Sequence, residues 1–396
     1  MTKFKGQIMN RNLWIIFPIL VCQAAWNPVV ATISNIQIYL ASLVLFIFFI
    51  LRLIIESTQD HLGKQSDSFP LWAYFGYCLI FLLSVFIHGF NLFALGNFAR
   101  VSALVMMLIF IRQFEEGLKH LVSAYLFFSF FLCLILLFNL VESGIVISNR
   151  ISPVGQGSAN SFGASLALVL ILRFSLQSSY TRSDNLRFYF IGFPVVFLTI
   201  LGTFSRGATL GLIFGLLVLG MQVIKVAQAP RILGVICLIF VVNEIWGFVR
   251  LASFSRFSVS SFRDSSGRTV IFQNSIESFL NDPIFGSGVG SKLNPFSSGE
   301  ASAHNVFLQA VGETGLLGFL FLTLILFIVA SRYAPKTSLP ALACLFIVSL
   351  TDNHFLAVQF HFTAGLVYLS LLRDRHNREL SFNGIGITRL NKTQKS

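Results

Sequence analysis

Charged residues are scarce in this sequence. Asp, Glu, Lys and Arg together make up 11% of its 396 residues, whereas a soluble globular domain carries about 25%. The hydrophobic residues, 55% of the chain and including 45 Phe, stand in blocks of roughly 20 with polar breaks between them, which is the length that crosses a hydrocarbon core of about 30 Å. The low charge therefore excludes a soluble domain and predicts an all-α integral membrane protein.

Residue clusters that hold a metal or form disulfides are also missing. The cysteines stand singly in apolar segments, outside the long polar loop, so we interpret them as small buried hydrophobic residues. They are Cys22, Cys78, Cys133, Cys237 and Cys344. The sequence contains no spaced pair of carboxylates and no His/Cys cluster with metal-ligand spacing. We therefore expect neither a metal nor another cofactor.

A nucleotide-binding loop is absent as well. Residues 286–292 are rich in glycine, but a serine separates Gly290 from Lys292, and a phosphate-binding loop of the type G-x-x-x-x-G-K-[ST] has the two adjacent. We interpret the segment as a flexible turn between two helices. The alternative interpretation is that its backbone N–H groups assist an anionic ligand.

Twelve transmembrane spans account for the apolar blocks. No cleavable signal peptide is expected, because the first block lacks an A-x-A-like cleavage site and continues as an ordinary span. The spans are predicted near 13–31, 36–55, 71–90, 92–111, 118–141, 159–177, 187–204, 207–226, 231–250, 313–331, 338–355 and 357–373. The chain is then a single polytopic domain, 1–396, with one large polar loop, 251–312, between spans nine and ten.

The net charge of +12 is distributed unevenly over the two sides of this topology. With both termini in the cytoplasm, most of the 28 basic residues fall in cytoplasmic segments, as the positive-inside rule requires. The large loop then lies on the outer side. The exceptions to the rule are Arg100, inside the fourth span, and the outer basic residues Arg150, Arg206, Arg250, Arg256, Arg263, Arg268 and Lys292.

Two short helices are predicted within the loop. The first begins at Gly267 and ends at Asn281-Asp282-Pro283. Its apolar residues share one face: Phe272, Ile276, Phe279 and Leu280. The second begins near Ala303-His304 and breaks at Gly312, before span ten.

Three of the outer residues are the main candidates for chemistry. Arg206 lies in the first turn of span eight, where a cation opposes the helix dipole; it either snorkels at the interface or clamps an anion. Arg268, at the start of the first loop helix, is a solvated charge or a ligand contact, and Arg263 shares its stretch. His304 is a surface residue or, because nearby arginines favour the neutral imidazole, a base for a hydroxyl proton.

Further candidates are less well defined. An arginine inside the bilayer, such as Arg100, costs roughly 2.5–3.5 kcal/mol and must face a polar interior or snorkel outward. Asp352 and His354 lie near the outer end of span eleven. Glu300 and Glu313 are within reach of the loop, although Glu313 is as easily a residue of the helix start.

Several of these motifs resemble those of the O-antigen ligase family. Residues 304–309 (HNVFLQ) and 312–318 (GETGLLG) resemble the signature that closes the family's outer loop. Ser266-Gly267-Arg268 and 281–288 (NDPIFGSG) resemble its loop pattern, and Ser205-Arg206-Gly207 resembles its arginine before a span. Residues 150–160 match more loosely, with Ala159-Asn160 in place of Pro-Asn. The resemblance covers spans six to ten.

The resemblance implies a GT-C-like fold and metal-independent glycan transfer from an undecaprenyl-diphosphate carrier on the periplasmic face of a Gram-negative inner membrane. A ligase of this family joins O-antigen to the lipid A–core oligosaccharide. Carried over by motif, Arg206 and Arg268 would bind the diphosphate and His304 would act as the base. Arg100, Arg150, Arg263 and Asn305 are added as further substrate-binding residues.

Other functions remain open at this point. O-antigen or exopolysaccharide polymerases of the same superfamily use the same donor and are not separated by length or loop size. The lack of a large soluble C-terminal domain argues against a protein oligosaccharyltransferase. A transporter or flippase typically has midplane ionisable sites and repeated halves, whereas here only Arg100 is a mid-span arginine. Nucleic acid is not expected as a partner.

Overall fold

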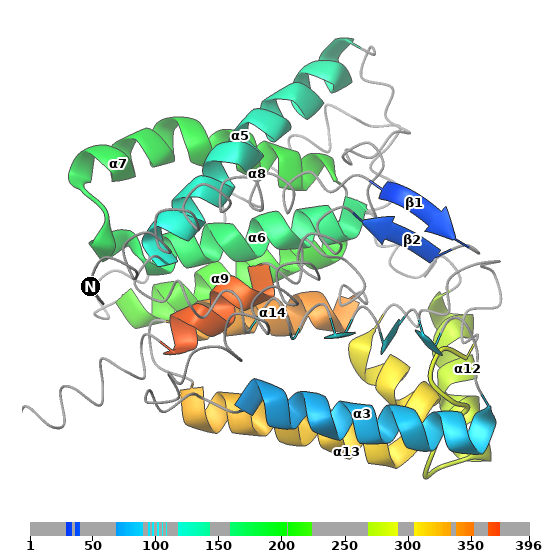
Figure 1. The fold of residues 1–396 in the computed structure, drawn as a ribbon. Coiled ribbons are helices and arrows are strands. Elements are labelled where there is room, and N and C mark those ends of the chain that lie inside the picture. Colours follow the sequence, from blue (N-terminus) through cyan, green and yellow to red (C-terminus); the bar gives the residue numbers. More distant parts are fainter. Residues whose placement is uncertain are drawn as a thin grey trace, which may run out of the picture.

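The computed structural model describes residues 29–33, 36–39, 69–89, 118–142, 159–203, 205–223, 268–291, 305–333, 338–351 and 363–372, together with single residues between 94 and 108 (Figure 1). Within these segments almost all secondary structure is helical. The all-α character predicted from composition is therefore confirmed for the described part of the chain, with one short exception.

The exception is an antiparallel hairpin formed by β1 (Val29–Ile33) and β2 (Ile36–Tyr39), with Ile33 opposite Ile36. The predicted first and second spans run into these strands, so they are wrong at residues 29–31 and 36–39. Most residues here are β-branched, which favours an extended backbone over a helix. They are Val29, Val30, Thr32, Ile33, Ile36 and Ile38. The remainder of both spans lies outside the described residues.

Helices lie at most of the other predicted spans. They are α3 (Phe69–His88), α5 (Leu118–Glu142), α6 (Ala159–Ser175), α8 (Phe193–Gly202), α9 (Arg206–Val223), α13 (Val306–Tyr333), α14 (Leu339–Thr351) and the helix Thr363–Leu372. Among the described residues, three stretches are long and apolar enough to cross a membrane, namely Leu118–Asn139, Arg182–Gly202 and Val306–Val329. The described residues of the fourth span are helical, and the ninth, 231–250, lies outside the described residues.

Span seven begins earlier than predicted. Thr181 caps the short helix α7 (Arg182–Arg187) by accepting a hydrogen bond from the backbone N–H of Asp184 at 3.2 Å. A π-helical segment, η3 (Phe188–Gly192), then leads into α8. Pro194 lies in the first turn of α8 and has no N–H to donate to an α-helical ladder. The predicted start at residue 187 missed the turn formed by α7.

Helix α6 forms the centre of the hydrophobic core. Its side chains are buried on all sides from Ala159 to Arg173 apart from Asn160, as expected for a helix without a polar face. It packs against α5, α8, α9 and α14. Close approach depends on small residues. At Gly215 of α9, an added Cβ would lie 2.8 Å from Ile171, and at Gly211 it would lie 2.6 Å from Val348.

These contacts fix which helix ends lie together. Gly163 meets Ala208 and Gly215 meets Ile171, so α6 and α9 run in the same direction. Gly211 meets Val348 whereas Gly215 meets the carbonyl of Pro340, so α14 runs antiparallel to α9. The start of α9 therefore lies at the same end of the bundle as the end of α14. The ends of α6 and α9 lie at the opposite end, beside α7 (Figure 1).

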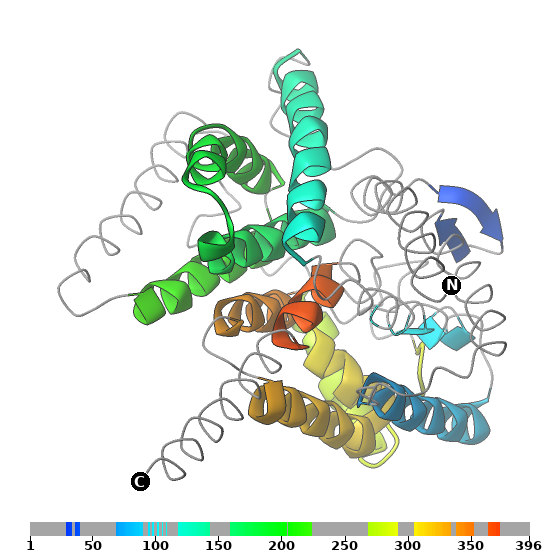
Figure 2. The ribbon, with the colours of Figure 1, turned by 60° about the vertical axis from the view of Figure 1, so that its left-hand side comes forward.

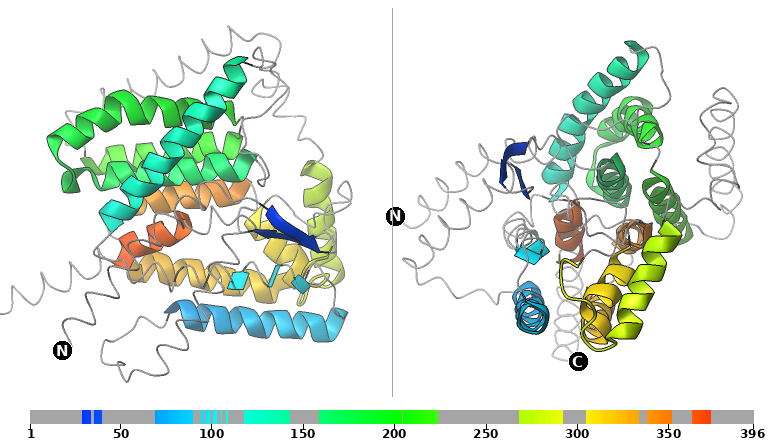
Figure 3. Two further views of the ribbon diagram at one scale, coloured as in Figure 1. Left: turned by 45° about the horizontal axis from the view of Figure 1, so that its top comes forward. Right: turned by 90° about the vertical axis from the view of Figure 1, so that its right-hand side faces the viewer.

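Helix α12 (Arg268–Asn281) crosses the end of the bundle that carries the start of α9. In Figure 1 it stands nearly perpendicular to α3 and α13, which pack side by side; Figure 2 shows the same helices after a turn of 60°. Figure 3 (right) looks along α3, α6 and α9, and α12 lies across this view. The first loop helix is thus confirmed in its bounds and lies across one end of the bundle.

Candidate active site

Arg206 is held at the first position of α9 by a hydroxyl cap. The Oγ of Ser205 accepts a hydrogen bond from the N–H of Ala208 at 3.2 Å. The Oγ1 of Thr203 accepts from the N–H of Ser205 at 3.3 Å and donates to the carbonyl of Ile200 at 2.7 Å. Ser205 and Thr203 are buried while Arg206 is half-buried. The guanidinium charge and the positive end of the helix dipole therefore add at one location, which favours an anion.

Asn305 caps α13 and ties it to α14. Its Oδ1 accepts hydrogen bonds from the N–H groups of Phe307 at 2.9 Å and Leu308 at 3.1 Å, and its Nδ2 donates to the carbonyl of Leu350 at 2.9 Å. The rings of Phe307 and Phe346 add an edge-to-face contact with centroids 5.7 Å apart. Asn305 therefore positions the start of α13. Its contact with substrate stays a prediction.

The start of α12 lies beside the start of α13. Ile271 packs against Leu308, and the Oγ of Ser278 donates to the carbonyl of Gly312 at 2.7 Å. These two contacts show that the helices run in the same direction. Arg268 precedes Ile271 by three residues, and Asn305 precedes Leu308 by three residues. Because Ile271 contacts Leu308, Arg268 and Asn305 lie at the same level of the two helices. The structure describes the backbone of Arg268 as the first residue of α12.

Helix α14 connects the start of α9 with the starts of α12 and α13. Asn305 binds the carbonyl of Leu350, and α14 packs antiparallel on α9 through Val348 and Gly211. Leu350 is thus level with the first turn of α9, where Arg206 lies. Segments far apart in the sequence, at residues 206, 268 and 305, meet at one end of the bundle. Arg100, Arg150, Arg263, Glu300, His304, Asp352 and His354 lie outside the described residues.

The glycine-rich turn is fixed against α13, which the interpretation as a flexible turn did not anticipate. Ser287 N–H donates to the carbonyl of Gly312 at 2.9 Å, and Gly288 N–H donates to that of Glu313 at 3.0 Å. In return, Leu316 N–H donates to the carbonyl of Pro283 at 2.8 Å. The turn therefore pairs with the backbone of α13.

Hydrogen bonds within the protein also use the remaining N–H groups of this turn. Gly286 donates to the carbonyl of Asp282 at 2.8 Å, and Ser291 donates to that of Gly288 at 3.1 Å. Val289 donates to the Oγ of Ser84 at 2.7 Å, and Gly290 donates to the carboxylate of Glu313. With every N–H from 286 to 291 in use, the alternative of a backbone anion site is wrong for this segment.

Glycine makes this pairing possible. Gly286 and Gly315 have φ of 67° and 59°, and a Cβ on either would lie within 2.7 Å of backbone atoms of the other segment. Gly315 also interrupts α13, dividing it into a short loop helix and the span. The predicted break at Gly312 was three residues early, because the sequence alone does not show which glycine takes the left-handed conformation.

Glu313 has a more defined place than the sequence indicated. Its side chain is buried, with a relative exposure of 6%, and accepts hydrogen bonds from the side chain of Gln309 and the N–H of Gly290. Both donors are neutral. A buried carboxylate in this position joins the turn to α13, so its role is to hold the outer loop together.

A polar cavity of about 480 Å³ opens between the end of α3, α12 and the glycine-rich turn. All of its lining residues except Gly286 have polar side chains: His88, Asn274, Glu277, Ser278, Asn281, Asp282, Ser287 and Ser291. Hydroxyl, amide and carboxylate groups of this kind suit the hydroxyls of a sugar. Sequence reasoning missed these residues, although Asn274, Glu277 and Asn281 recur at helical spacing on α12.

None of the apolar residues predicted to share one face of α12 is buried. Phe272 and Phe279 are half-buried, whereas Ile276 is 48% and Leu280 66% exposed. The buried face of α12 carries Ile271 and Ser275 instead. An exposed apolar stripe on a helix at the end of a membrane bundle suits the lipid boundary.

Comparison with known proteins adds a family match. The model of the family described as O-antigen ligase matches residues 191–323. None of the curated proteins compared with the chain matches it. The matched region runs from the end of η3 into α13, so it contains Arg206, Arg268, His304 and Asn305.

Proposed function

We propose that this chain, which the model of the O-antigen ligase family matches over residues 191–323, moves O-antigen from undecaprenyl diphosphate to the lipid A–core oligosaccharide on the periplasmic face of the inner membrane. The family implies a glycosyltransferase-like activity with lipid-linked substrates. The observation that carries the proposal is that the starts of α9, α12 and α13 lie at one end of the helix bundle.

The proposed architecture is a GT-C-like arrangement of twelve spans with the loop 251–312 in the periplasm and both termini in the cytoplasm. The distribution of charge between the two ends supports it. Lys119, Arg173, Arg182 and Arg187 lie at the end opposite Arg206, because Tyr180 beside α7 donates to the carbonyl of Lys119 at 3.0 Å. Basic residues gather on the cytoplasmic side of membrane proteins. Arg206 is one of the exceptions to this rule, and a periplasmic anion would explain it.

The proposed chemistry is direct displacement of the lipid diphosphate. His304 takes the proton of the acceptor hydroxyl, whose oxygen forms a bond to the anomeric carbon of the donor as the bond to the diphosphate oxygen breaks. Arg206 and Arg268 bind the leaving diphosphate through paired N–H donors. Since charge develops on that oxygen in the transition state, the loss of one such donor costs about 10²–10³ in rate, and the loss of the base costs about 10²–10⁴.

The first experiment replaces Arg206 and His304 singly by Ala in a host lacking its own copy, with Arg187→Ala at the opposite end as the matched control. Immunoblotting of membranes checks that each protein is inserted. We expect both site variants to lose long O-antigen chains from lipid A–core on a gel of surface glycan, while Arg187→Ala keeps them. Normal ladders from well-inserted Arg206→Ala and His304→Ala proteins would contradict the assignment.

The same gel separates a ligase from a polymerase of the superfamily. Without a ligase, long chains stay on the undecaprenyl carrier and the core is bare. Without a polymerase, the core carries a single repeat. A single-repeat band in the deletion strain would therefore replace the ligase proposal by a polymerase that uses the same donor and the same residues.

A further inference from the structure

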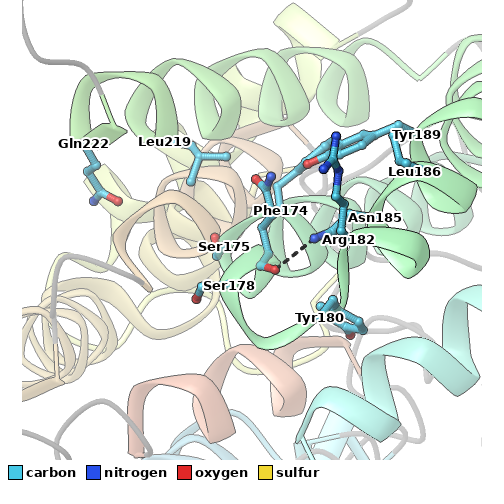
Figure 4. Close-up of a pocket in the computed structure, with 11 residues that line it drawn as sticks. Phe174, Ser175, Ser178, Tyr180, Arg182, Asn185, Leu186, Tyr189, Leu219 and Gln222 are labelled. Carbon is cyan, nitrogen blue, oxygen red and sulfur yellow. Dashed lines mark hydrogen bonds between the residues drawn. The ribbon is translucent and has the colours of Figure 1, made fainter.

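A second cavity lies at the end of the bundle opposite the candidate active site. It has a volume of about 800 Å³ and lies between the ends of α6 and α9, the 3₁₀ turn η2 (Gln177–Ser179) and α7 (Figure 4). Pockets that hold small ligands occupy about 300–1,000 Å³. Under the topology proposed above, this cavity is at the cytoplasmic surface of the membrane. It is therefore distinct from the site of glycan transfer.

The lining of the cavity is divided into apolar and polar parts. Phe174, Leu186, Tyr189 and Leu219 provide large apolar surfaces, and Arg182 provides a cation that is exposed to solvent. The polar remainder consists of Ser175, Gln177, Ser178, Tyr180, Asn185 and Gln222. Figure 4 shows Leu219 and Gln222 projecting from α9 across from Arg182, Leu186 and Tyr189. A ligand that fits both parts has an apolar tail and a polar head.

Arg173 is buried directly behind the lining residues Tyr180 and Asn185. The Cζ of Arg173 lies 3.5 Å from the ring centroid of Tyr180 and 4.6 Å from that of Phe188, and its Nη2 donates to the Oδ1 of Asn185 at 2.9 Å. Arg173 is only 4% exposed, and these three partners are neutral. The Nδ2 of Asn185 donates to the carbonyl of Gln177 at 3.3 Å (Figure 4). These contacts hold Tyr180, Asn185 and Gln177 in place on this side of the cavity, and Arg173 adds a positive charge there.

The charge around the cavity is positive in sum among the described residues. Arg182 and Arg187 lie on α7, Arg173 lies behind it, and the Nζ of Lys119 is 5.0 Å from the ring of Tyr180. The opposing carboxylate on the same short helix is Asp184, which accepts from the Oγ1 of Thr181 at 2.8 Å. The field in the cavity therefore favours an anion over a neutral head group.

The cavity is bordered by surface that faces lipid. Leu186 is 48%, Phe190 78% and Met221 69% exposed, and all three lie on the helices that form the cavity. Exposed apolar side chains of this size at a membrane surface are normally covered by acyl chains. A ligand that arrives through the bilayer can therefore enter directly, whereas a soluble nucleotide or free phosphate gains nothing from these surfaces.

We propose that this cavity binds an anionic phospholipid of the inner leaflet, with its phosphate at Arg182 and an acyl chain along Phe174, Leu186, Tyr189 and Leu219. Basic pockets between helices on the cytoplasmic side suit anionic head groups. The proposal depends on the membrane orientation described above and is independent of glycan transfer.

The test is a titration of the full-length protein in detergent with phosphatidylglycerol, phosphatidylcholine and inorganic phosphate, with bound lipid counted by native mass spectrometry. We expect phosphatidylglycerol to bind at least tenfold more tightly than phosphatidylcholine. Arg182→Gln is expected to weaken phosphatidylglycerol binding about tenfold or more, the loss of one charge-assisted contact. Arg187→Gln, which removes an exposed charge of the same helix outside the cavity lining, is the matched control.

A second variant tests the apolar half. Leu219→Trp fills the cavity while keeping every charge, and it should weaken phosphatidylglycerol binding as strongly as Arg182→Gln does. Equal binding by the Arg182→Gln and Arg187→Gln proteins would overturn the proposal. So would displacement of phosphatidylglycerol by inorganic phosphate at matched concentration, which would identify a site for free anions. Because lipid is counted directly, these results do not depend on whether the protein proves to be a ligase.

Discussion

At the scale of single residues, several polar groups hold the backbone at the end of the bundle that carries the start of α9. Asn305, Ser205 and Glu313 use their side-chain oxygens on backbone N–H groups or on neighbouring side chains. Arg206 carries a charge at the capped start of α9. The first three residues fix the backbone around the helix starts, which is the usual role of residues that support a site.

These contacts make Asn305 a positioning residue with a measurable effect. Asn305→Ala removes both acceptor bonds to α13 and the donor bond to Leu350. We expect kcat for glycan transfer to fall about 10–10²-fold, because a displacement of about 1 Å in a reacting group has that order of effect. KM for the acceptor should change little.

Two comparisons give this prediction its control. Asn305→Asp keeps an oxygen for the cap and should recover part of the rate. Thr323→Ala, which removes an exposed hydroxyl bonded within the span of α13, should leave the rate unchanged. A rise in KM with an unchanged kcat for Asn305→Ala would instead indicate that Asn305 binds substrate.

At the scale of elements, the crossing of the glycine-rich turn and α13 is constrained by close backbone contacts at Gly286 and Gly315. Gly286→Ala puts a Cβ 2.7 Å from the carbonyl oxygen of Gly312 at a φ of 67°. We expect a loss of about 2–4 kcal/mol in the free energy of unfolding, since a left-handed residue with a Cβ costs about 1–2 kcal/mol and overpacking costs about 1–3 kcal/mol. Thermal unfolding in detergent measures it.

Gly89→Ala is the matched control for that prediction. Gly89 also has a positive φ, 82°, but among the described residues nothing lies within 4 Å of an added Cβ. The substitution should cause only the smaller, conformational part of the loss. Equal destabilisation by the two substitutions would mean that the close approach of the turn to α13 contributes nothing to stability.

The positions of the helices along the sequence were more predictable than their contacts in space. Blocks of about 20 apolar residues located α3, α5, α6 and α9 to within a few residues, because length and hydropathy are local properties. The exposed apolar stripe of α12 and the pairing at Gly286 depend on what lies opposite in space. Periodicity gives the spacing of a face but not its partner, so it grouped Ile276 and Leu280 on one face without showing that this face is exposed.

At the scale of the whole molecule, the two ends of the bundle have different chemistry. One end has the capped start of α9, the interfacial helix α12 and a polar cavity. The other has the basic helix α7 and an amphipathic cavity. The sequence anticipated the separation through the positive-inside rule, although it did not locate either cavity. Both cavities are formed by segments distant in the chain, which no local pattern reveals.

The separation predicts the sidedness of labelling in cells. In a protein whose five native cysteines are replaced by Ala, Ser287→Cys lies in the outer turn and Ser178→Cys lies beside α7, and both positions are exposed. We expect a maleimide that crosses the outer but not the inner membrane to label Ser287→Cys in intact cells. Ser178→Cys should react only after the inner membrane is permeabilised.

The reverse labelling would place Arg206 in the cytoplasm and the basic helix α7 in the periplasm. Such an orientation would place most of the Lys and Arg residues outside the cytoplasm, against the positive-inside rule. It would also remove Arg206 from the periplasmic face, where we propose that the glycan on undecaprenyl diphosphate is transferred. It would also move the amphipathic cavity to the outer leaflet, so the phospholipid proposal would lose its anionic surface. Sidedness is therefore the property on which the assignments at both ends of the molecule depend.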